Sequence, residues 1–498
     1  MALSLTALMA TGCRPFNGRT PLANVTIIGG GMAGCELALQ LAMRDIDVKL
    51  IEMRPDKMTD AHLTEGLAEL VCSNSFRGDA VGNAVGLIKE EMRRAGGRLI
   101  ALAEHAAVPA GGALAVDREK FSELVQAEVA AEPRITLERR EWTTLEDPEA
   151  DITVIATGPL TSGALAEAII ERSGEEQLYF YDSIAPIIDA ESIDRDVVFA
   201  QSRYGKGDGD DYLNCPLDKE QYLAFIENVN AAEMAPVAAF EETKFFEACL
   251  PIEVMAERGV DTPRYGPMKP VGITDPRTGE QSYAIIQLRQ ENIEATAYNM
   301  VGFQSRMKWG EQKRIFRQIP GLEEAEFLRF GSVHRNTFVH GPKLLGPALE
   351  FAGSKTLRFA GQITGVEGYV ESMATGLILG HLLAAELHGH EVRLPPGTTA
   401  LGALRRHVTG ELSVDIERFQ PSNINWSMFP EMEVQRKMHK RKKRLHMSTR
   451  ALADLELWLV GLAGLGMRRP GFQKRDPEVE MKALADQPPR RRRGKLPK

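Results

Sequence analysis

Three glycines near the start of the chain, Gly29, Gly31 and Gly34, have the GxGxxG spacing that receives the pyrophosphate of a dinucleotide. The first glycine allows a tight turn, the second lets the backbone approach the pyrophosphate, and the third lets helix and strand pack closely. Glu52 follows 23 residues after Gly29, and its carboxylate can accept hydrogen bonds from both ribose hydroxyls. The pattern predicts an ADP-containing dinucleotide held by Gly29, Gly30, Gly31, Met32, Ala33, Gly34 and Glu52.

The segments around these glycines have the order that a dinucleotide site needs. Val25–Ile28 is a short apolar run that predicts a buried strand, Cys35–Arg44 favours a helix, and Val48–Ile51 predicts a second strand that ends at Glu52. The free amides at the start of the helix can bind phosphate. A glycine-rich helix start in an ordinary α/β core is the alternative interpretation.

Two later segments extend the prediction from a dinucleotide to FAD. Residues 151–158 predict a buried strand ending in Thr157 and Gly158, and residues 357–376 predict a strand that ends near Gly361 and Gln362, followed by a helix. Two nucleotide-contacting turns so far apart fit FAD better than a single NAD site. We therefore predict an α/β fold with an FAD-binding Rossmann-like domain of glutathione-reductase-like topology.

The middle of the chain differs in character from its flanks. Residues 181–331 are rich in aromatic residues and proline and lack a βαβ rhythm, which indicates an inserted α+β domain for the substrate. The FAD-binding domain would then consist of residues 23–180 and 332–432. Residues 433–466 predict a basic C-terminal helix, and residues 1–22 and 467–498 predict a disordered extension and an Arg- and Pro-rich disordered tail.

The charge distribution and the cysteine pattern of the 498-residue protein limit which partners and which cellular compartment can be expected. From Arg436 onward 19 Lys and Arg stand against 6 Asp and Glu, whereas the whole chain has a net charge of -9. A basic end on an acidic body suggests a polyanionic partner, and a solubilising tail is the alternative. The five cysteines form no CxxC pair and no metal-ligand spacing, which favours a reducing compartment and no metal. No apolar run reaches membrane-span length, and the first twenty residues lack a charged signal-peptide start, so we expect a cytoplasmic protein without a membrane.

Longer motifs make the sequence similar to a known family. These are GGGMAG with EMRP, AELVCSNSFR, NAVGLIKEEMRR, VPAGGALAVDR, IATGPLTS, LYFYDSIAPI, PMKPVG, GFQSRMKWGEQKR, HRNTF, FAGQITGVEGYVES and QPSNINW. Together they resemble the folate- and FAD-dependent tRNA (uracil-5-)-methyltransferases over about residues 24–459. The family is similar to the GidA-type flavoproteins that modify the tRNA wobble uridine, which are longer at the C-terminus and remain the second candidate.

The resemblance implies a reaction and its cofactors. A one-carbon unit passes from methylenetetrahydrofolate to C5 of a uridine in the T-loop of tRNA, FAD supplies the hydride, and NAD(P)H reduces the flavin again. A generic FAD/NAD(P)H oxidoreductase and a non-catalytic RNA-binding flavoprotein stay open as alternatives. The oligomeric state does not follow from the sequence.

The reaction needs a thiolate, because uracil C5 becomes nucleophilic only after a nucleophile adds to C6. Cys249 in FEACLPIE and Cys72 in ELVCSNS occupy family motifs. We assign Cys249 as the C6 nucleophile and expect Cys72 near the flavin N5, which it would guard or assist. Cys215 is the rival to Cys249, and a buried core cysteine is the plain alternative for each. Prolines beside Cys215 and Cys249 predict that both lie at turns or element ends.

Three further polar residues are weaker candidates. Glu253 could take the C5 proton, although a carboxylate near a helix start is an equal interpretation. His334 and Arg335 could bind folate or phosphate, although a core histidine is more common.

Overall fold

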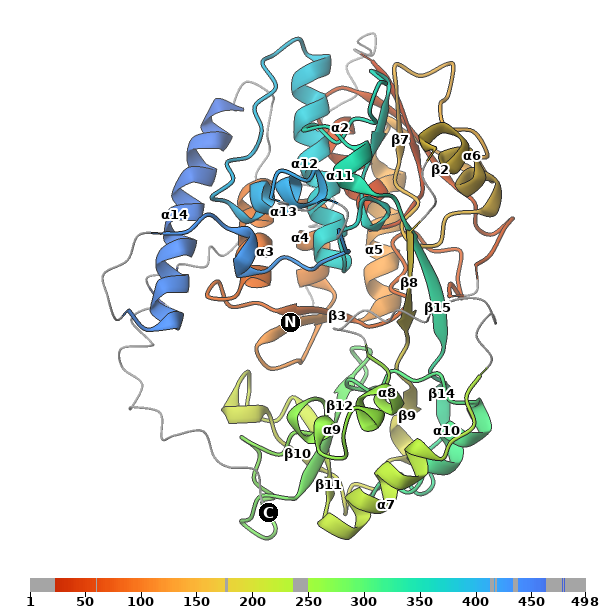
Figure 1. Ribbon diagram of the computed structural model, residues 1–498, viewed down its shortest axis with the longest axis vertical. Coiled ribbons are helices and arrows are strands. Elements are labelled where there is room, and N and C mark those ends of the chain that lie inside the picture. The colour runs from red at the N-terminus through yellow and green to blue at the C-terminus, as the bar shows by residue number, and fades with distance from the viewer. Residues whose placement is uncertain are drawn as a thin grey trace.

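The computed structural model shows two lobes, one above the other in Figure 1. It describes residues 23–59, 61–174, 178–235, 250–412, 416, 419–432, 438–462, 477 and 479. We call the upper part the parallel lobe and the lower part, which is built within residues 184–332, the antiparallel lobe. Two separate clusters of buried apolar side chains fill them, so each lobe has its own core.

The parallel lobe is organised around a five-stranded sheet with the spatial order β6-β2-β1-β7-β16, in which all neighbours run parallel. Its strands are β1 (Asn24–Ile28), β2 (Asp47–Glu52), β6 (Ile135–Arg139), β7 (Ile152–Ile155) and β16 (Leu357–Phe359). The carboxyl end of β1 lies between those of β2 and β7, because these are its neighbours. In Rossmann-like folds this is where the nucleotide binds.

Two helices, α2 (Met32–Ala42) and α12 (Tyr369–Leu387), pack against each other in the parallel lobe (Figure 1). All 11 residues of α2 are buried. A Cβ atom at Gly376 of α12 would lie 2.4 Å from the carbonyl oxygen of Ala33, so glycine is what lets the two backbones approach. Among the described residues, α12 is the one helix long and apolar enough to cross a membrane, but 89% of its apolar window is buried inside the protein.

The remaining elements of the parallel lobe surround this centre. A small antiparallel sheet has the order β3-β5-β4 and contains β3 (Ser75–Gly78), β4 (Ala107–Val108) and β5 (Ala113–Val116). The other helices are α3 (Ala84–Arg94), α4 (Arg98–His105), α5 (Arg118–Ala131), α6 (Gly163–Ser173), α11 (Gly341–Leu344), α13 (Ala400–Val408) and α14 (Lys440–Gly461), with short 3-10 turns at Gln362–Thr364 and Trp426–Met428.

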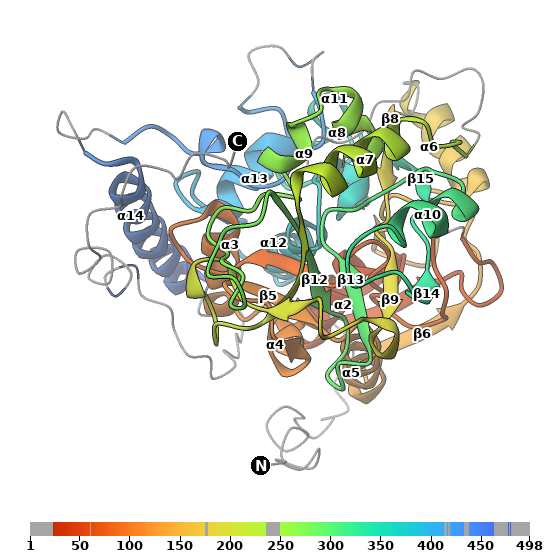
Figure 2. The same cartoon turned by 90° about the horizontal axis from the view of Figure 1, so that it is seen from below.

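The antiparallel lobe is a six-stranded sheet with the order β10-β11-β12-β13-β9-β14. Its strands are β9 (Ile187–Asp189), β10 (Phe199–Ala200), β11 (Tyr212–Leu217), β12 (Ala284–Gln290), β13 (Ala297–Met300) and β14 (Phe327–Arg329), and its helices are α7 (Lys219–Asn230), α8 (Ile252–Glu257), α9 (Thr262–Tyr265) and α10 (Trp309–Phe316), with 3-10 turns at Ala190–Ser192 and Arg203–Gly205. Figure 2 shows α7, α8 and α9 on one side of β12 and β13. Phe225 and Ile226 of α7 pack there into the same core as Ile286 of β12.

The lobes are joined by a two-stranded antiparallel ribbon of β8 (Leu178–Ser183) and β15 (Val333–Phe338), which carries the chain out of the parallel lobe and back (Figure 1). The segment between these strands builds the antiparallel sheet, as the sequence predicts for an insertion. The insertion thus leaves the parallel sheet after β7 and returns before β16.

Most predicted elements of the parallel lobe are confirmed, with shifted ends. The helix predicted over Cys35–Arg44 begins at Met32, because Gly31 directly precedes the helix as its N-cap. The expectation that Cys215 lies at a turn is wrong, since Cys215 lies inside β11 and pairs with Ile286. Pro216 is tolerated there because β10 pairs with β11 only up to Asn214, so no second neighbour needs the missing amide.

The close contact of α2 and α12 predicts a large effect for a small change. We expect Gly376→Ala to lower the free energy of unfolding by about 1–3 kcal/mol, because its methyl group meets backbone rather than a movable side chain. Gly310→Ala is the matched control, since Gly310 lies in α10 and a Cβ there meets nothing within 4 Å. That control should be neutral or slightly stabilising. Urea unfolding followed by circular dichroism compares them, and equal midpoints would contradict the packing argument.

Candidate functional site

The predicted glycine turn lies at the carboxyl end of β1, where it enters α2. Gly29 has a φ of +113°, which favours glycine, and a Cβ there would lie 2.5 Å from the carbonyl oxygen of Ala156. A Cβ at Gly34 would lie 1.9 Å from the carbonyl oxygen of Gly29. These two glycines therefore allow the turn to pack against its own helix and against the end of β7, as the GxGxxG spacing predicts.

Gly31 differs from its neighbours because it faces open space. A Cβ at this position would meet no atom within 4 Å. Gly31 is the N-cap of α2 and no side chain caps the helix, so the amides of its first turn are left for another partner. Met32 and Ala33 begin the helix directly behind this space. The partial positive charge of a helix start favours an anion there.

Glu52 at the end of β2 is fixed beside this turn. Its Oε2 accepts from the Gly30 amide at 3.0 Å, and its Oε1 accepts from the amide and the Nε of Arg54 at 3.0 and 2.9 Å. Burial alone would raise the pKa of the carboxyl, but the bonds from Arg54 and Gly30 outweigh it and lower the pKa. The side chain is thus ionised at neutral pH, and Oε2, which accepts only the Gly30 amide, keeps its second lone pair for a hydroxyl.

The other two predicted turns lie at the ends of the neighbouring strands. Thr157 and Gly158 follow β7, and the Thr157 hydroxyl shares a hydrogen bond of 2.7 Å with Thr161. A Cβ at Gly158 would again meet nothing within 4 Å. Gly361 follows β16, donates its amide to the Thr375 hydroxyl at 2.7 Å, and would place a Cβ 2.8 Å from the Cβ of Ala33.

The structure thus brings the early and late turns together, although Ala33 and Gly361 are far apart in sequence. Gln362 begins the 3-10 turn after Gly361, and its Nε2 donates to Oε2 of Glu367 at 2.9 Å. Open space at Gly31 and Gly158, a bare helix start and an ionised carboxylate fit the phosphates and ribose of FAD.

The loop that carries Cys72 begins at this nucleotide turn. The Ala68 amide donates to the carbonyl of Gly30 at 2.9 Å, and Cys72 follows in a segment without helix or strand. The hydroxyl of Tyr369, the first residue of α12, accepts from the Cys72 amide at 2.9 Å and lies 3.2 Å from the Cys72 sulfur. Cys72 is partly exposed and follows four residues after Ala68, which is hydrogen-bonded to the nucleotide turn.

Strand β12 of the antiparallel lobe holds the same loop from the other side. The guanidinium of Arg289 donates to Asn74 Oδ1 at 2.8 Å and to the Ser73 hydroxyl at 3.0 Å, and Asn74 donates back to the carbonyl of Gln290 at 2.9 Å. Arg118 of α5 forms an ion pair with Glu291. The Cys72 loop therefore lies at the junction of the two lobes.

Four residues of this junction, Tyr369, Asn74, Arg118 and Arg289, are not predicted as site residues from the sequence. The first three lie within the family motifs, in GYVES, CSNS and VDR. Arg289 lies in an ordinary strand pattern and gives no sequence signal. Only the fold brings these four together.

The other cysteines differ from Cys72 in exposure. Cys35 and Cys215 are fully buried, and burial strongly raises the pKa of both thiols. Cys35 also donates to the carbonyl of Gly30 at 3.2 Å, as a packing residue would. Cys249 and Cys13 lie outside the described residues.

The weaker candidates gain little from the structure. Glu253 lies in the first turn of α8, is fully buried, and accepts from the Arg306 amide at 2.7 Å, while burial raises its pKa. His334 and Arg335 lie on β15, and the structure describes only their backbone. Within the described ranges, no three His, Cys, Asp or Glu side chains gather as a metal site would require.

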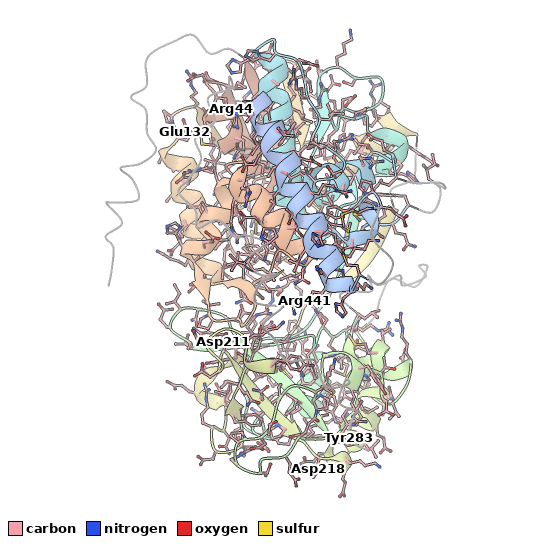
Figure 3. All side chains as sticks on the ribbon, turned by 90° about the vertical axis from the view of Figure 1, so that its left-hand side faces the viewer. Arg44, Glu132, Asp211, Asp218, Tyr283 and Arg441 are labelled. Carbon is pink, nitrogen blue, oxygen red and sulfur yellow. The ribbon has the colours of Figure 1, made fainter. Side chains whose placement is uncertain are left out.

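The C-terminal helix α14 packs against the parallel lobe, and its N-terminal end consists of cationic residues. The Ser448 hydroxyl donates to the carbonyl of Val81 at 2.7 Å, and Trp458 Nε1 donates to the carbonyl of Arg393 at 2.8 Å. The helix starts with KRKKR, residues 440–444, all of which are at least partly exposed. Figure 3 shows Arg441 at the end of α14 that points toward the antiparallel lobe.

Comparison with solved structures identifies the fold. Two crystal forms of Aquifex aeolicus GidA match with a TM-score of 0.63, and form II covers 88% of this chain and 74% of its own length at 16% identity. This likeness confirms the predicted flavoprotein fold.

Comparison of sequences identifies the family. The family model for GIDA, Glucose inhibited division protein A, matches residues 24–391. A methylenetetrahydrofolate--tRNA-(uracil-5-)-methyltransferase TrmFO of Geobacter sulfurreducens is 54% identical over 88% of this chain and 99% of its own length. The protein of the same name from Rhodospirillum rubrum is 53% identical over 87% of this chain and 92% of its own. The chain therefore belongs to the GidA family of flavoproteins and, within that family, to the TrmFO group.

Proposed function

We propose that the protein methylates C5 of a uridine in the T-loop of tRNA, with methylenetetrahydrofolate as carbon donor and FAD as cofactor. The observation that carries the proposal is the Cys72 loop, which starts at the predicted nucleotide turn and reaches the junction of the lobes. It supports a thiol that acts beside the predicted flavin site, and the TrmFO relatives are named methylenetetrahydrofolate--tRNA-(uracil-5-)-methyltransferases. NAD(P)H would reduce the flavin again, and the cytoplasm is the expected compartment.

The residues that would hold FAD are those of the three turns. The open space at Gly31 and the amides of Met32, Ala33 and Gly34 would receive the pyrophosphate, and Glu52 would receive the ribose hydroxyls. Gly29 and Gly30 shape the turn, while Thr157, Gly158, Gly361 and Gln362 would line the rest of the cofactor. When bound and reduced, FAD supplies the hydride that completes the methyl group.

The protein's own share of the chemistry is to activate C5. Addition of a thiolate to C6 forms a sulfur–carbon bond and moves an electron pair onto the uracil ring, which makes C5 nucleophilic. After C5 gains its carbon it loses a proton, and the thiolate leaves C6 to restore the double bond. We keep Cys249 as this nucleophile and Cys72 as the thiol beside the flavin. The burial of Cys35 and Cys215 supports this by removing both as competitors.

The basic start of α14 supports tRNA as partner. Lys440, Lys442 and Lys443 make no ion pair within the part of the chain that the structure describes. Cations at a helix N-terminus oppose the helix dipole, so this placement does not stabilise the helix. A bound phosphate backbone would compensate for that repulsion. The antiparallel lobe and α14 are thus the proposed surfaces for tRNA.

One incubation separates the remaining function classes. Purified protein with tRNA transcript, methylenetetrahydrofolate and NADPH should yield 5-methyluridine on nucleoside analysis. A modified wobble uridine would favour the GidA-type activity, oxidation of NADPH alone would favour a generic oxidoreductase, and tRNA binding without any modification would favour a non-catalytic flavoprotein. Omitting S-adenosylmethionine throughout excludes the commoner methyl donor.

Gly31→Val should remove FAD without unfolding the protein. A Cβ at this position points into the space that the pyrophosphate would occupy and meets no protein atom within 4 Å. We expect a colourless protein with a urea midpoint close to that of apoprotein prepared from the wild type. Gly163→Val, at an equally open position in α6, is the control and should stay yellow. Full flavin content in Gly31→Val, measured by absorbance near 450 nm, would refute the assignment.

A covalent trap identifies the nucleophile. tRNA with 5-fluorouridine at the target should attach to the wild-type protein, because fluorine at C5 cannot leave as a proton. Cys249→Ser should keep FAD and lose methylation by at least about a hundredfold, since a serine hydroxyl is scarcely ionised. Cys215→Ser should remain active because that thiol is buried. Peptide mapping decides, and RNA attached to Cys72 would reverse the two roles that we assign.

The basic start of α14 predicts a salt-dependent contribution to tRNA affinity. Replacing residues 440–444 with Gln should weaken binding to all tRNAs alike and reduce the log–log salt slope by roughly one unit for each lost phosphate contact. Lys442→Gln can be compared with Arg172→Gln, an equally exposed cation on α6 at the opposite flank (Figure 1). Filter binding between about 50 and 200 mM salt measures the slopes. An unchanged slope in the fivefold variant would place the RNA elsewhere.

A further inference from the structure

The contacts of Tyr369 with the Cys72 loop determine where its phenolic hydrogen goes. The oxygen of Tyr369 accepts from the Cys72 amide at 2.9 Å and, at the longer distance of 3.5 Å, from the Ser73 amide. A phenol oxygen has two acceptor positions and one hydrogen to donate. The two amides occupy the acceptor side, so the hydrogen is left for the Cys72 sulfur at 3.2 Å.

We propose that Tyr369 is the positioning residue of Cys72 and donates its phenolic hydrogen to the sulfur, which holds the side chain in the thiolate form. The inference rests on the proposed role of Cys72 as the thiol beside the flavin, but the protonation of the sulfur can be measured without that reaction. A hydrogen bond to an anion is stronger than one to a neutral acceptor, so the contact favours the thiolate.

Burial keeps Tyr369 in the form that can donate. Tyr369 is partly buried against the Cys72 loop, and burial of its phenol together with the nearby Cys72 raises its pKa well above the usual value. The ring is fixed by an edge contact with Phe76, whose centroid lies 6.0 Å away. Tyr369 therefore remains a protonated donor throughout the pH range in which a cysteine titrates.

The charged groups around this pair come from three elements, α5, β12 and β14, and from two loop residues, Glu69 and Glu291. Arg118 of α5 and Arg329 of β14 both lie within electrostatic reach of Cys72 and Tyr369, and Arg289 of β12 binds the next residue, Ser73. Glu291 pairs with Arg118, and Glu69 lies within reach of Arg329. Glu69 also pairs with Arg54, which in turn pairs with Glu52. Four cations thus face three carboxylates, and a thiolate at Cys72 would balance their charge.

Tyr369→Phe tests the proposal because it removes the hydroxyl and keeps the ring. Holoenzyme is alkylated with iodoacetamide between pH 5 and 10, and the Cys72 peptide is quantified by mass spectrometry so that other cysteines do not contribute. We expect the midpoint of the rate profile to rise by about one pH unit. The plateau at high pH should rise about threefold, because a thiolate of higher pKa is the better nucleophile.

Because both the midpoint and the plateau rise, the rate profile of Tyr369→Phe should cross that of the wild type. A loss of packing alone does not produce this crossing. Tyr265→Phe removes an exposed hydroxyl and should leave midpoint and plateau unchanged. Replacing Tyr369 with 3-fluorotyrosine, a stronger donor, should shift the midpoint downward, and this variant decides the matter if Tyr369→Phe fails to retain FAD. An unchanged midpoint in both Tyr369 variants would overturn the proposal. A shifted midpoint in a protein that does not methylate tRNA would leave it standing and refute only the proposed function.

Discussion

The backbone contact between α2 and α12 is the constraint on which the rest of the structure depends. Gly376 lets α12 approach the carbonyl of Ala33, and Gly361 approaches the same residue from the end of β16. Two segments therefore converge on the first turn of α2, and neither can carry a larger side chain at its point of approach. The open space at Gly31 lies directly before this first turn, because Gly31 is the N-cap of α2.

This convergence also sets where the chemistry can occur. Tyr369 begins α12 and Gly376 lies two turns later on the same helix, so the helix that packs on α2 also holds the Cys72 loop. At the start of that loop the Ala68 amide donates to the carbonyl of Gly30. Further along, Ser73 and Asn74 form hydrogen bonds with β12 of the antiparallel lobe. Any motion between the lobes would be transmitted to the thiol through these bonds, because β12 is hydrogen-bonded directly to the loop.

The sequence predicts the parallel lobe well because its signals are local. Glycine spacing, an apolar strand and Glu52 all lie within thirty residues, and each element forms where the pattern indicates. Cys215 shows where such reasoning fails, since a neighbouring proline excludes a helix interior but not a strand with one unpaired edge. The contact of Tyr369 with Cys72 spans 297 residues. No local pattern contains such a pair, and the motif resemblance flags both residues without stating that they touch.

The charge balance at the junction depends on both lobes. Arg118 belongs to the parallel lobe, whereas Arg289, Glu291 and Arg329 belong to the antiparallel lobe. If the lobes separated, Cys72 would keep the cation Arg118 without its carboxylate partner and would lose the bonds that hold Ser73 and Asn74. The electrostatic field at the sulfur would therefore change although no residue near the flavin site had moved. A substrate that binds across both lobes would stabilise the docked arrangement, and it would thereby fix the charge environment of the thiol when the reaction requires it.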